Sequence, residues 1–302
     1  IHIVNSDDVT AFNKYEIILE ELGDIYRRHN LRDPRVLAYC QPVYNINKRK
    51  YDTAEALMRL KLPGLGLVFP DQFIHLAEEN GYIHVLTEII LQKTCDEIRH
   101  LLSKGYDVNR ISVNVSVLEL RDEKFTEDIH KIILESGIPE EKVAIEITES
   151  RSESDFKLMK AKIEELRERG IMFYLDDFGT GYSNMERIME LPFDIIKFDR
   201  SLVIASDSND RSKSMVSSLA DMFSKMEYSV LYEGVENEVD ENRCIDMHAS
   251  YLQGYKYSRP IPIIDLQNFF SKVEDENKVE EKSKEEIIKE EIVKEEAGAG
   301  EA

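Results

Sequence analysis

The chain has 302 residues, 42% hydrophobic and 33% charged, and its formal net charge of −21 argues against a nucleic-acid duplex as a partner, because phosphate binding needs a basic surface. No apolar run approaches the roughly 20 residues that a membrane-spanning helix requires, and no signal peptide is recognisable. Three widely spaced cysteines, Cys40, Cys95 and Cys244, exclude a disulfide framework, so we expect a reduced, cytoplasmic protein with no cysteine zinc site.

The two ends of the chain differ in composition from its middle. Residues 12–30 show an amphipathic helical pattern ahead of the first predicted strand, and we interpret residues 1–33 as a linker helix. Because the chain begins with Ile1 rather than methionine, we expect the protein to continue upstream. Residues 272–302 are Glu/Lys-rich and low in complexity, which predicts a solvated helix or a disordered tail. The folded domain should therefore span residues 34–271.

Between these ends, strand-like apolar runs alternate with helical patterns. Strands are predicted at eight places: 35–45, 53–60, 110–116, 142–148, 172–177, 194–199, 229–234 and 251–258. Helical patterns are predicted at 85–105, 125–137, 154–170 and 212–226, and glycines end three of them. This alternation predicts an α/β fold of the TIM-like (β/α)8 type, with its active site at the C-terminal strand ends. A doubly wound open sheet is the alternative, since periodicity does not separate the two.

Polar side chains recur at or near the C-terminal ends of the predicted strands. In chain order they are Glu55, Arg59, Asn114, Glu146, Glu149, Asp176, Asp177, Lys197, Glu233 and Gln253. Taken singly, each is typical of a surface residue or a helix cap, but independent surface residues would not all fall at one end of a barrel. The pair Asp176 and Asp177 is the most informative, because adjacent strand residues point to opposite faces and cannot both face one core.

In a barrel, five carboxylates would converge on one mouth, and they could not all stay ionised without counter-charges. These five are Glu55, Glu146, Asp176, Asp177 and Glu233. Oxygen ligands without His or Cys favour Mg²⁺ or Mn²⁺, and we interpret most of the histidines as structural or surface residues. The aspartate pair predicts two ions, an arrangement that suits phosphoryl displacement by an activated water. Acids and a lysine on successive strands also fit Mg²⁺-dependent enolising enzymes, in which the lysine is a base.

Nine segments in a fixed order closely resemble the EAL family of bacterial cyclic di-GMP phosphodiesterases. They are CQPV, EALMR (Glu55 to Arg59), FPDQFIHLAEENG, SVNVS, EITES, DDFGTGYSN, IIKFDR, EGVEN and QGYKYSRP. The resemblance covers residues 36 to 270 approximately. It implies a barrel whose first strand runs antiparallel to the others, a homodimer, and a sensory or cyclase-like domain upstream.

The resemblance also implies a role for each matching position. Metal ligands are implied at six positions, Glu55, Asn114, Glu146, Asp176, Asp177 and Glu233, with Asp176 bridging two ions. Lys197 would hold and polarise the attacking water, and Glu149 would anchor the loop that begins at Asp176. Substrate contacts are implied for Gln41, Arg59 and Gln253, the first through a base and the second through a phosphate.

The implied activity is hydrolysis of cyclic di-GMP to linear pGpG, with Lys197, Glu233, Glu55 and Asp176 as the catalytic residues and Mg²⁺ or Mn²⁺ as cofactors. A catalytically silent cyclic di-GMP receptor is the alternative, although such relatives typically lack metal ligands and this chain keeps them all. The departures from the family pattern are Thr53, Leu60 and Asn184, and none of them removes a ligand.

Overall fold

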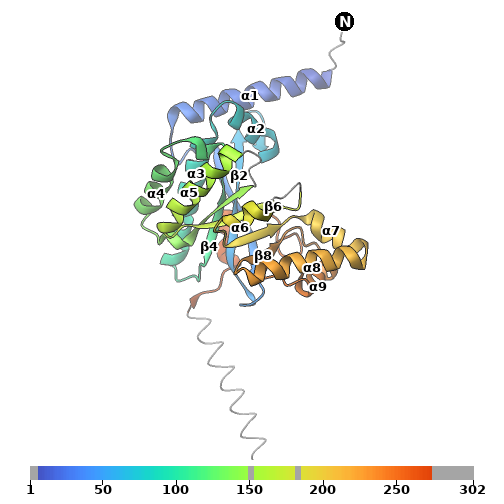
Figure 1. Cartoon of the computed structure of the whole chain (residues 1–302). Coiled ribbons are helices and arrows are strands. Elements are labelled where there is room, and N and C mark those ends of the chain that lie inside the picture. Colours follow the sequence, from blue (N-terminus) through green and yellow to red (C-terminus); the bar gives the residue numbers. More distant parts are fainter. Residues whose placement is uncertain (1–5, 149–152, 181–184, 274–302) are drawn as a thin grey trace, which may run out of the picture.

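A computed structural model describes residues 6–148, 153–180 and 185–273, apart from the side chains of 6–12 and 153–155 (Figure 1). Within these residues, ten strands form a single sheet that closes on itself. The strands are β1 (Val36–Asn45), β2 (Lys50–Leu62), β3 (Gly66–Val68), β4 (Arg110–Asn114), β5 (Val143–Thr148), β6 (Met172–Phe178), β7 (Ile195–Phe198), β8 (Ser229–Tyr232), β9 (Tyr251–Leu252) and β10 (Ile261–Pro262). The barrel order is β1, β2, β4, β5, β6, β7, β8, β9 and back to β1, so the predicted TIM-like barrel is confirmed and the open sheet is wrong.

The first strand runs against the rest of the barrel. β1 pairs antiparallel with β2, where Gln41 lies opposite Glu55, and antiparallel with β9, where Tyr44 lies opposite Leu252. The other neighbours in the barrel are parallel. The cause is the connection: only a short turn at 46–49 joins β1 to β2, and a connection this short can join only antiparallel strands.

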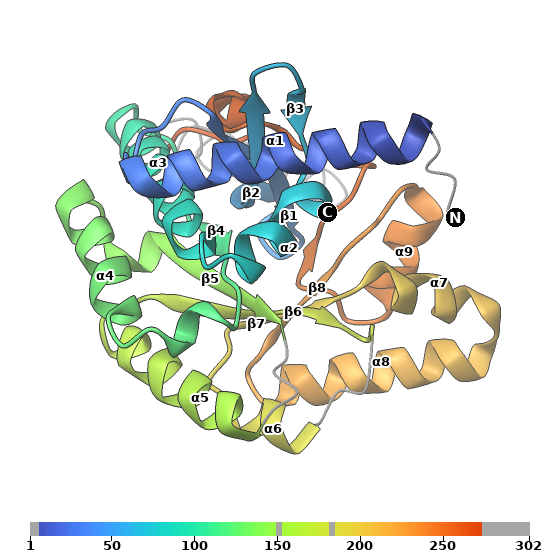
Figure 2. The same cartoon turned by 90° about the horizontal axis from the view of Figure 1, so that it is seen from above.

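Helices surround the barrel, as the view from above shows (Figure 2). The α-helices are α1 (Ser6–Arg28), α2 (Pro70–Glu79), α3 (Ile83–Ser103), α4 (Phe125–Ser136), α5 (Glu153–Glu168), α6 (Met185–Glu190), α7 (Arg200–Ser208), α8 (Asp210–Lys225) and α9 (Glu238–Asp246). The 3-10 helices are η1 (Glu119–Arg121), η2 (Glu140–Lys142) and η3 (Ile263–Asn268). All the predicted helical patterns correspond to helices here, whereas α2, α6, α7 and α9 were not predicted.

The N-terminal helix α1 packs on the domain beside α2 (Figures 1 and 2). Its residues Ile18, Leu22 and Ile25 recur at helical spacing, and each is at most 2% exposed within the domain's main hydrophobic core. The segment predicted as a linker therefore contributes to the core at its C-terminal half. Most of the predicted tail at 272–302 lies outside the described residues.

The eighth predicted strand ends much earlier than expected, because β9 covers only Tyr251 and Leu252. From Gln253 on, the backbone bonds to the loop after β8: Val235 N donates to Gln253 O at 3.0 Å, and Lys256 N donates to Val235 O at 3.0 Å. Two loops at the barrel mouth are thereby fixed to each other. No described helix is both long and apolar enough to cross a lipid bilayer.

Replacing Gly254 with alanine should destabilise the domain by several kcal/mol, at or above the roughly 1–3 kcal/mol typical of overpacking. A Cβ at this position would lie 2.2 Å from the backbone oxygen of Val235, and neither strand-end loop can move without breaking the bonds described above. Gly23→Ala is the matched control. It lies within α1, where a Cβ would meet the flexible end of Arg27 at 3.3 Å and the hydroxyl of Tyr82 at an ordinary contact distance of 3.5 Å, so it should be neutral or slightly stabilising. Equal midpoints of urea unfolding for the two variants would contradict this expectation.

Candidate active site

Lys197 on β7 lies at the centre of the polar cluster at the barrel mouth. Its side chain is 1% exposed, and its ammonium nitrogen contacts four carboxylates from β2, β5, β6 and the end of β8. The distances from Lys197 Nζ are 2.5 Å to Glu146 Oε2, 2.9 Å to Asp176 Oδ1, 3.0 Å to Glu233 Oε1 and 3.2 Å to Glu55 Oε2. The structure thus brings the predicted lysine and four predicted acids into one contact set.

A β-bulge explains how the adjacent residues Asp176 and Asp177 both reach this mouth. The pairing of β6 with β7 shifts register between Leu175 and Phe178, and Asp177 has a φ of 56°, in the left-handed region. A bulge interrupts the alternation that would send consecutive side chains to opposite faces. As a result, Asp176, Asp177 and Glu233 each offer a carboxylate oxygen within 4.8 Å of the others.

Glu55 accepts hydrogen bonds from strand ends on both sides of β2, through Asn114 and Gln253. Asn114 Nδ2 donates to its Oε1 at 2.7 Å, and Gln253 Nε2 donates to its Oε2 at 2.7 Å. Gln253 Nε2 also lies 3.2 Å from Gln41 Oε1, and Gln41 in turn donates to Ser258 O at 2.9 Å. Glu55 reaches the mouth from within a long strand because β2 pairs with β4 only as far as Ala56 and then continues beyond the barrel.

Electrostatics in the cluster show an excess of negative charge. Burial, together with the neighbouring carboxylates, raises the pKa of Glu146 well above its usual range and that of Glu233 to about 8. Burial acts in the same direction on Glu55, but Lys197 and the donors Asn114 and Gln253 outweigh it and lower the pKa of that carboxyl. With all five acids ionised, five carboxylates and one ammonium give a formal charge of −4, which two divalent cations would neutralise.

The donor set fits hard divalent cations. The oxygens come from carboxylates and from the Asn114 amide, which is the chemistry that Mg²⁺ and Mn²⁺ prefer. Asp176 Oδ1 is buried and accepts no hydrogen bond from any described residue; Lys197 Nζ approaches it at 2.9 Å, but without hydrogen-bond geometry. A buried oxygen without a donor is costly, and a cation between Asp176, Asp177 and Glu233 would satisfy it.

Arg59 lies near the cluster but outside it. It is on β2, four residues beyond Glu55, and is 8% exposed. Its guanidinium carbon lies 5.7 Å from the ring centre of Tyr39 and 5.3 Å from that of Phe69, and its Nη1 donates to Met58 O at 2.8 Å. Burial lowers the pKa of Arg59, so the group would gain from an anionic partner.

Two pockets meet the cluster from different sides. A pocket of about 360 Å³ between β2, β4, α2 and α3 includes Asn114, and one of about 240 Å³ includes Gln41, Glu233 and Gln253. Glu55 accepts hydrogen bonds from both Asn114 and Gln253, so its carboxylate lies between the two. A ligand with two arms could therefore extend into both pockets from the carboxylates.

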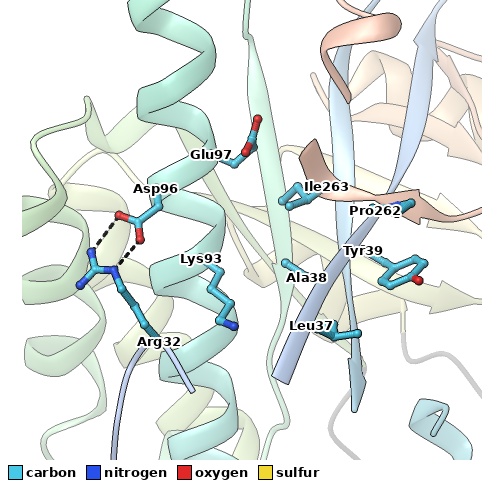
Figure 3. A pocket seen from close by; sticks show the side chains of 9 residues that line it. All are labelled: Arg32, Leu37, Ala38, Tyr39, Lys93, Asp96, Glu97, Pro262 and Ile263. Atoms are coloured by element: carbon cyan, nitrogen blue, oxygen red, sulfur yellow. Dashed lines mark hydrogen bonds and ion pairs between the residues drawn. The ribbon is translucent and has the colours of Figure 1, made fainter. Parts of the chain in front are cut away.

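A third pocket, of about 580 Å³, lies between α3 and the strands β1 and β10 (Figure 3). Arg32 at its rim makes two hydrogen bonds to Asp96, at 2.9 and 3.0 Å, and Lys93 donates to the backbone oxygens of Asp33 and Val36. None of the five carboxylates of the mouth lines it, so we assign this pocket no part in the chemistry.

Two residues of the site, Ser112 and Arg200, were not predicted from the sequence. Ser112 Oγ donates to Glu146 Oε1 at 2.5 Å and is 1% exposed. Strand alternation could have identified it, since Ser112 shares a strand face with Asn114 in SVNVS. Arg200 lines the smaller pocket and pairs with Glu236. Glu149, the predicted loop anchor, lies outside the described residues.

A closed barrel with one reversed strand and a carboxylate-rich mouth defines the class of protein. The EAL domain family matches residues 26–260, and the chain belongs to that family. Of its relatives, the cyclic di-GMP phosphodiesterase NbdA of Pseudomonas aeruginosa is 31% identical over 242 residues, which are 80% of this chain and 31% of NbdA. The cyclic di-GMP phosphodiesterase PdeL of Escherichia coli is 31% identical over 227 residues, covering 74% of this chain and 62% of PdeL.

Solved structures give the same fold. A complex of the PaMucR phosphodiesterase with c-di-GMP superposes with a TM-score of 0.73 at 27% identity, covering 81% of this chain and 97% of that one. The chain spans about a third of NbdA and less than two thirds of PdeL. The shared part is therefore the EAL domain, and the relatives' remaining segments have no counterpart in the match.

Proposed function

We propose that this chain is a metal-dependent phosphodiesterase that hydrolyses cyclic di-GMP to linear pGpG. The observation that supports this most is the burial of Lys197 among Glu55, Glu146, Asp176 and Glu233 at the mouth of an EAL barrel. The cytoplasmic location, the homodimer and the upstream sensory or cyclase-like domain stay predictions.

Six residues would hold two Mg²⁺ or Mn²⁺ ions: Glu55, Asn114, Glu146, Asp176, Asp177 and Glu233. When bound, such ions lower the pKa of a water molecule and neutralise charge on the phosphoryl group. The chain's own contribution is to fix the ligands: Ser112 holds Glu146, and Asn114 and Gln253 hold Glu55. Lys197 adds a fixed positive charge that orients the attacking water and stabilises charge developing on the phosphoryl oxygens.

The substrate would span the two pockets that meet at Glu55. Gln41 and Gln253 line one of them and offer amide groups to a base, while Asn114 lies in the other. Arg59, held between two aromatic rings, would bind a phosphate. In the described structure no carboxylate is bonded to the buried guanidinium of Arg59. A phosphate partner would explain the position of this charge beside the mouth.

Incubation with cyclic di-GMP and Mn²⁺, followed by chromatography, tests the proposal. We expect pGpG to appear, to disappear when a chelator removes the metal, and to return with Mg²⁺ or Mn²⁺. Ca²⁺ should support turnover poorly, because it prefers larger and looser coordination than Mg²⁺. Tight binding of cyclic di-GMP without any product would instead favour the receptor alternative.

Replacing Arg59 with methionine should raise KM for cyclic di-GMP by about 10- to 100-fold and change kcat much less, since a hydrogen bond to a charged group contributes about 1.5–3 kcal/mol. Methionine keeps the apolar length that packs between Tyr39 and Phe69. Arg32→Met is the control, because Arg32 pairs with Asp96 on the outside of the barrel. Steady-state kinetics of both variants would show the difference, and an unchanged KM in the Arg59 variant would remove this residue from the substrate site.

A further inference from the structure

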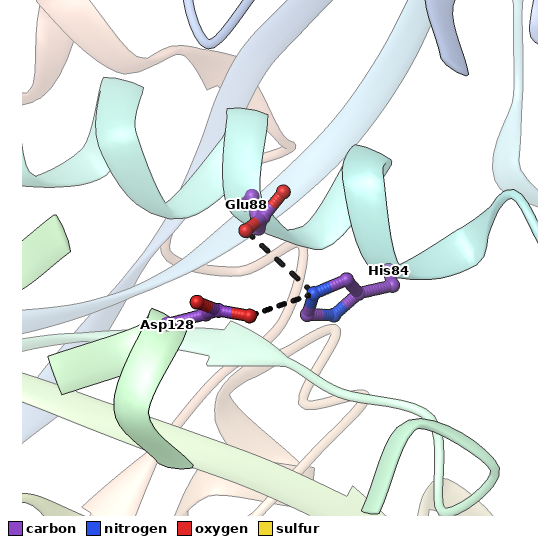
Figure 4. A group of neighbouring side chains, drawn as sticks. All are labelled: His84, Glu88 and Asp128. Carbon is purple, nitrogen blue, oxygen red and sulfur yellow. Dashed lines mark ion pairs between the residues drawn. The ribbon is translucent and has the colours of Figure 1, made fainter. Parts of the chain in front are cut away.

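A second group of metal-binding side chains lies on the helical layer, outside the barrel mouth. His84 is in the first turn of α3, Glu88 follows one turn later on the same face, and Asp128 projects from the first turn of α4 (Figure 4). The three offer one ligand atom each within 4.8 Å of one another. The mechanism proposed above uses none of them.

The distances within this group fit a bound ion better than direct hydrogen bonds. His84 Nε2 lies 3.6 Å from Glu88 Oε1 and 3.7 Å from Asp128 Oδ2, whereas N–H···O bonds are usually about 2.7–3.2 Å. Ligands about 2.0–2.2 Å from a tetrahedral ion are about 3.3–3.6 Å apart. Figure 4 shows Nε2 directed at both carboxylates, so one ion could bind all three atoms with small adjustments.

The buried carboxylate of Glu119 gives separate support for a metal site at His84. The Glu119 side chain is fully buried, and its Oε2 accepts bonds from Thr87 Oγ1 at 3.0 Å and from Ser116 N at 2.9 Å. Its other oxygen, Oε1, lies 3.7 Å from His84 Nδ1, and neither atom has a hydrogen-bond partner among the residues that the structure describes. A carboxylate behind the second ring nitrogen is the arrangement that orients metal-binding histidines and fixes their tautomer.

The side chains paired with His84 are negatively charged. Glu119, with burial acting in the opposite direction, raises the pKa of His84. Glu88 is held in place through its other oxygen, Oε2, which His29 Nε2 contacts from the end of α1. The cluster therefore joins α1, α3, η1 and α4 around one imidazole.

We propose that His84, Glu88 and Asp128 form a binding site for a divalent transition-metal ion of the Zn²⁺ type, with Glu119 orienting the imidazole. One imidazole and two carboxylates match the ligands of zinc sites that keep a water in the fourth position. The imidazole disfavours Mg²⁺ and Ca²⁺, which prefer oxygen. Since the ligands come from two helices, the ion would tie α3 to α4 and stabilise the helical layer.

Zinc content after equilibrium dialysis of the chain tests the proposal. Asp128→Asn and His84→Gln should each bind about one Zn²⁺ fewer per chain than the unchanged protein, and Zn²⁺ should raise their melting temperature less. Glu127→Gln is the matched control, because it removes the same charge from the same turn of α4 at an exposed position outside the cluster. It should bind as much zinc as the unchanged protein.

Co²⁺ gives a second readout that does not depend on turnover. The unchanged protein should show the visible absorption of a four-coordinate cobalt site with a nitrogen ligand, and His84→Gln should lose it. Asp176→Asn should retain this signal. The experiment therefore distinguishes an error in the proposed metal site at the barrel mouth from an error in the proposed site at His84. Equal zinc content in all the variants, or an equal loss in Glu127→Gln and Asp128→Asn, would overturn the proposal.

Discussion

Lys197→Ala is expected to reduce turnover of cyclic di-GMP by about 10²- to 10³-fold, the range seen when one fixed group that stabilises transition-state charge is removed. The ammonium is the one cation that the described structure bonds to Glu55, Glu146, Asp176 and Glu233 together. Its loss would also leave buried carboxylates without a counter-charge, which typically costs about 3–5 kcal/mol. The sequence predicts only a catalytic role for Lys197, and its four contacts add this structural role.

Metal ions should separate the two effects of this substitution. Divalent cations at the same carboxylates would replace the lost positive charge, so Mn²⁺ should restore much of the unfolding free energy of Lys197→Ala and little of its turnover. Lys48→Ala is the control, since Lys48 Nζ pairs at 2.7 Å with the fully buried Asp52 in a region outside the mouth. Its turnover should be unchanged. Near-normal hydrolysis by Lys197→Ala would refute the catalytic role.

The barrel could be predicted from the sequence because its signals are local. Apolar runs and glycine stops recur along the chain and place most strands within a few residues of their observed bounds. The elements that were not predicted correctly depend on contacts between residues distant in the chain, which the order of residues does not show. The segment 253–258 has two tyrosines at alternating positions, Tyr255 and Tyr257, as strands often do, yet Gly254 packs on the backbone of Val235 and turns the chain away. The unpredicted α6, α7 and α9 are short helices, of six to nine residues, in which periodicity is weak.

The composition of the site was predictable, but its geometry was not. Strand-end acids can be counted in a sequence, and the order of the EAL motifs supports their assignment. The bulge at Asp176 and Asp177 depends on the register between β6 and β7, which no residue pattern specifies. The cluster around His84 depends on the packing of α3 against α4, because His84 and Asp128 are 44 residues apart in the chain (84 to 128). For this reason, no function could be predicted for His84 from the sequence.

Asp176→Asn should lower turnover by at least about 100-fold, yet leave the metal-free protein as stable as before or more stable by about 1 kcal/mol. Asp176 contacts Lys197 and lies within 4.8 Å of the carboxylates of Asp177 and Glu233, so asparagine would keep the shape while removing a proposed bridging ligand. Even the loss of a residue that only hydrogen-bonds to a metal ligand typically lowers metal affinity 10- to 100-fold. The same change removes one of several repelling charges, and Asp176 is one of the causes that raise the pKa of Glu146 and Glu233.

Asp176→Asn should therefore lower turnover without lowering stability, and this combination makes it a sharp test. A site selected for metal binding should keep carboxylates that repel one another, whereas a purely structural cluster would avoid that repulsion. Titration with Mn²⁺ and urea unfolding in the presence of a chelator measure the two effects on the same sample. Asp246→Asn is the control, since it makes the same change at an exposed position on α9, where Asp246 pairs with Lys213 at 3.1 Å outside the cluster; it should change neither metal affinity nor turnover substantially. If Asp176→Asn lowered stability as much as Lys197→Ala and kept its affinity for Mn²⁺, the carboxylates would be a structural ion-pair network centred on Lys197 rather than a metal site.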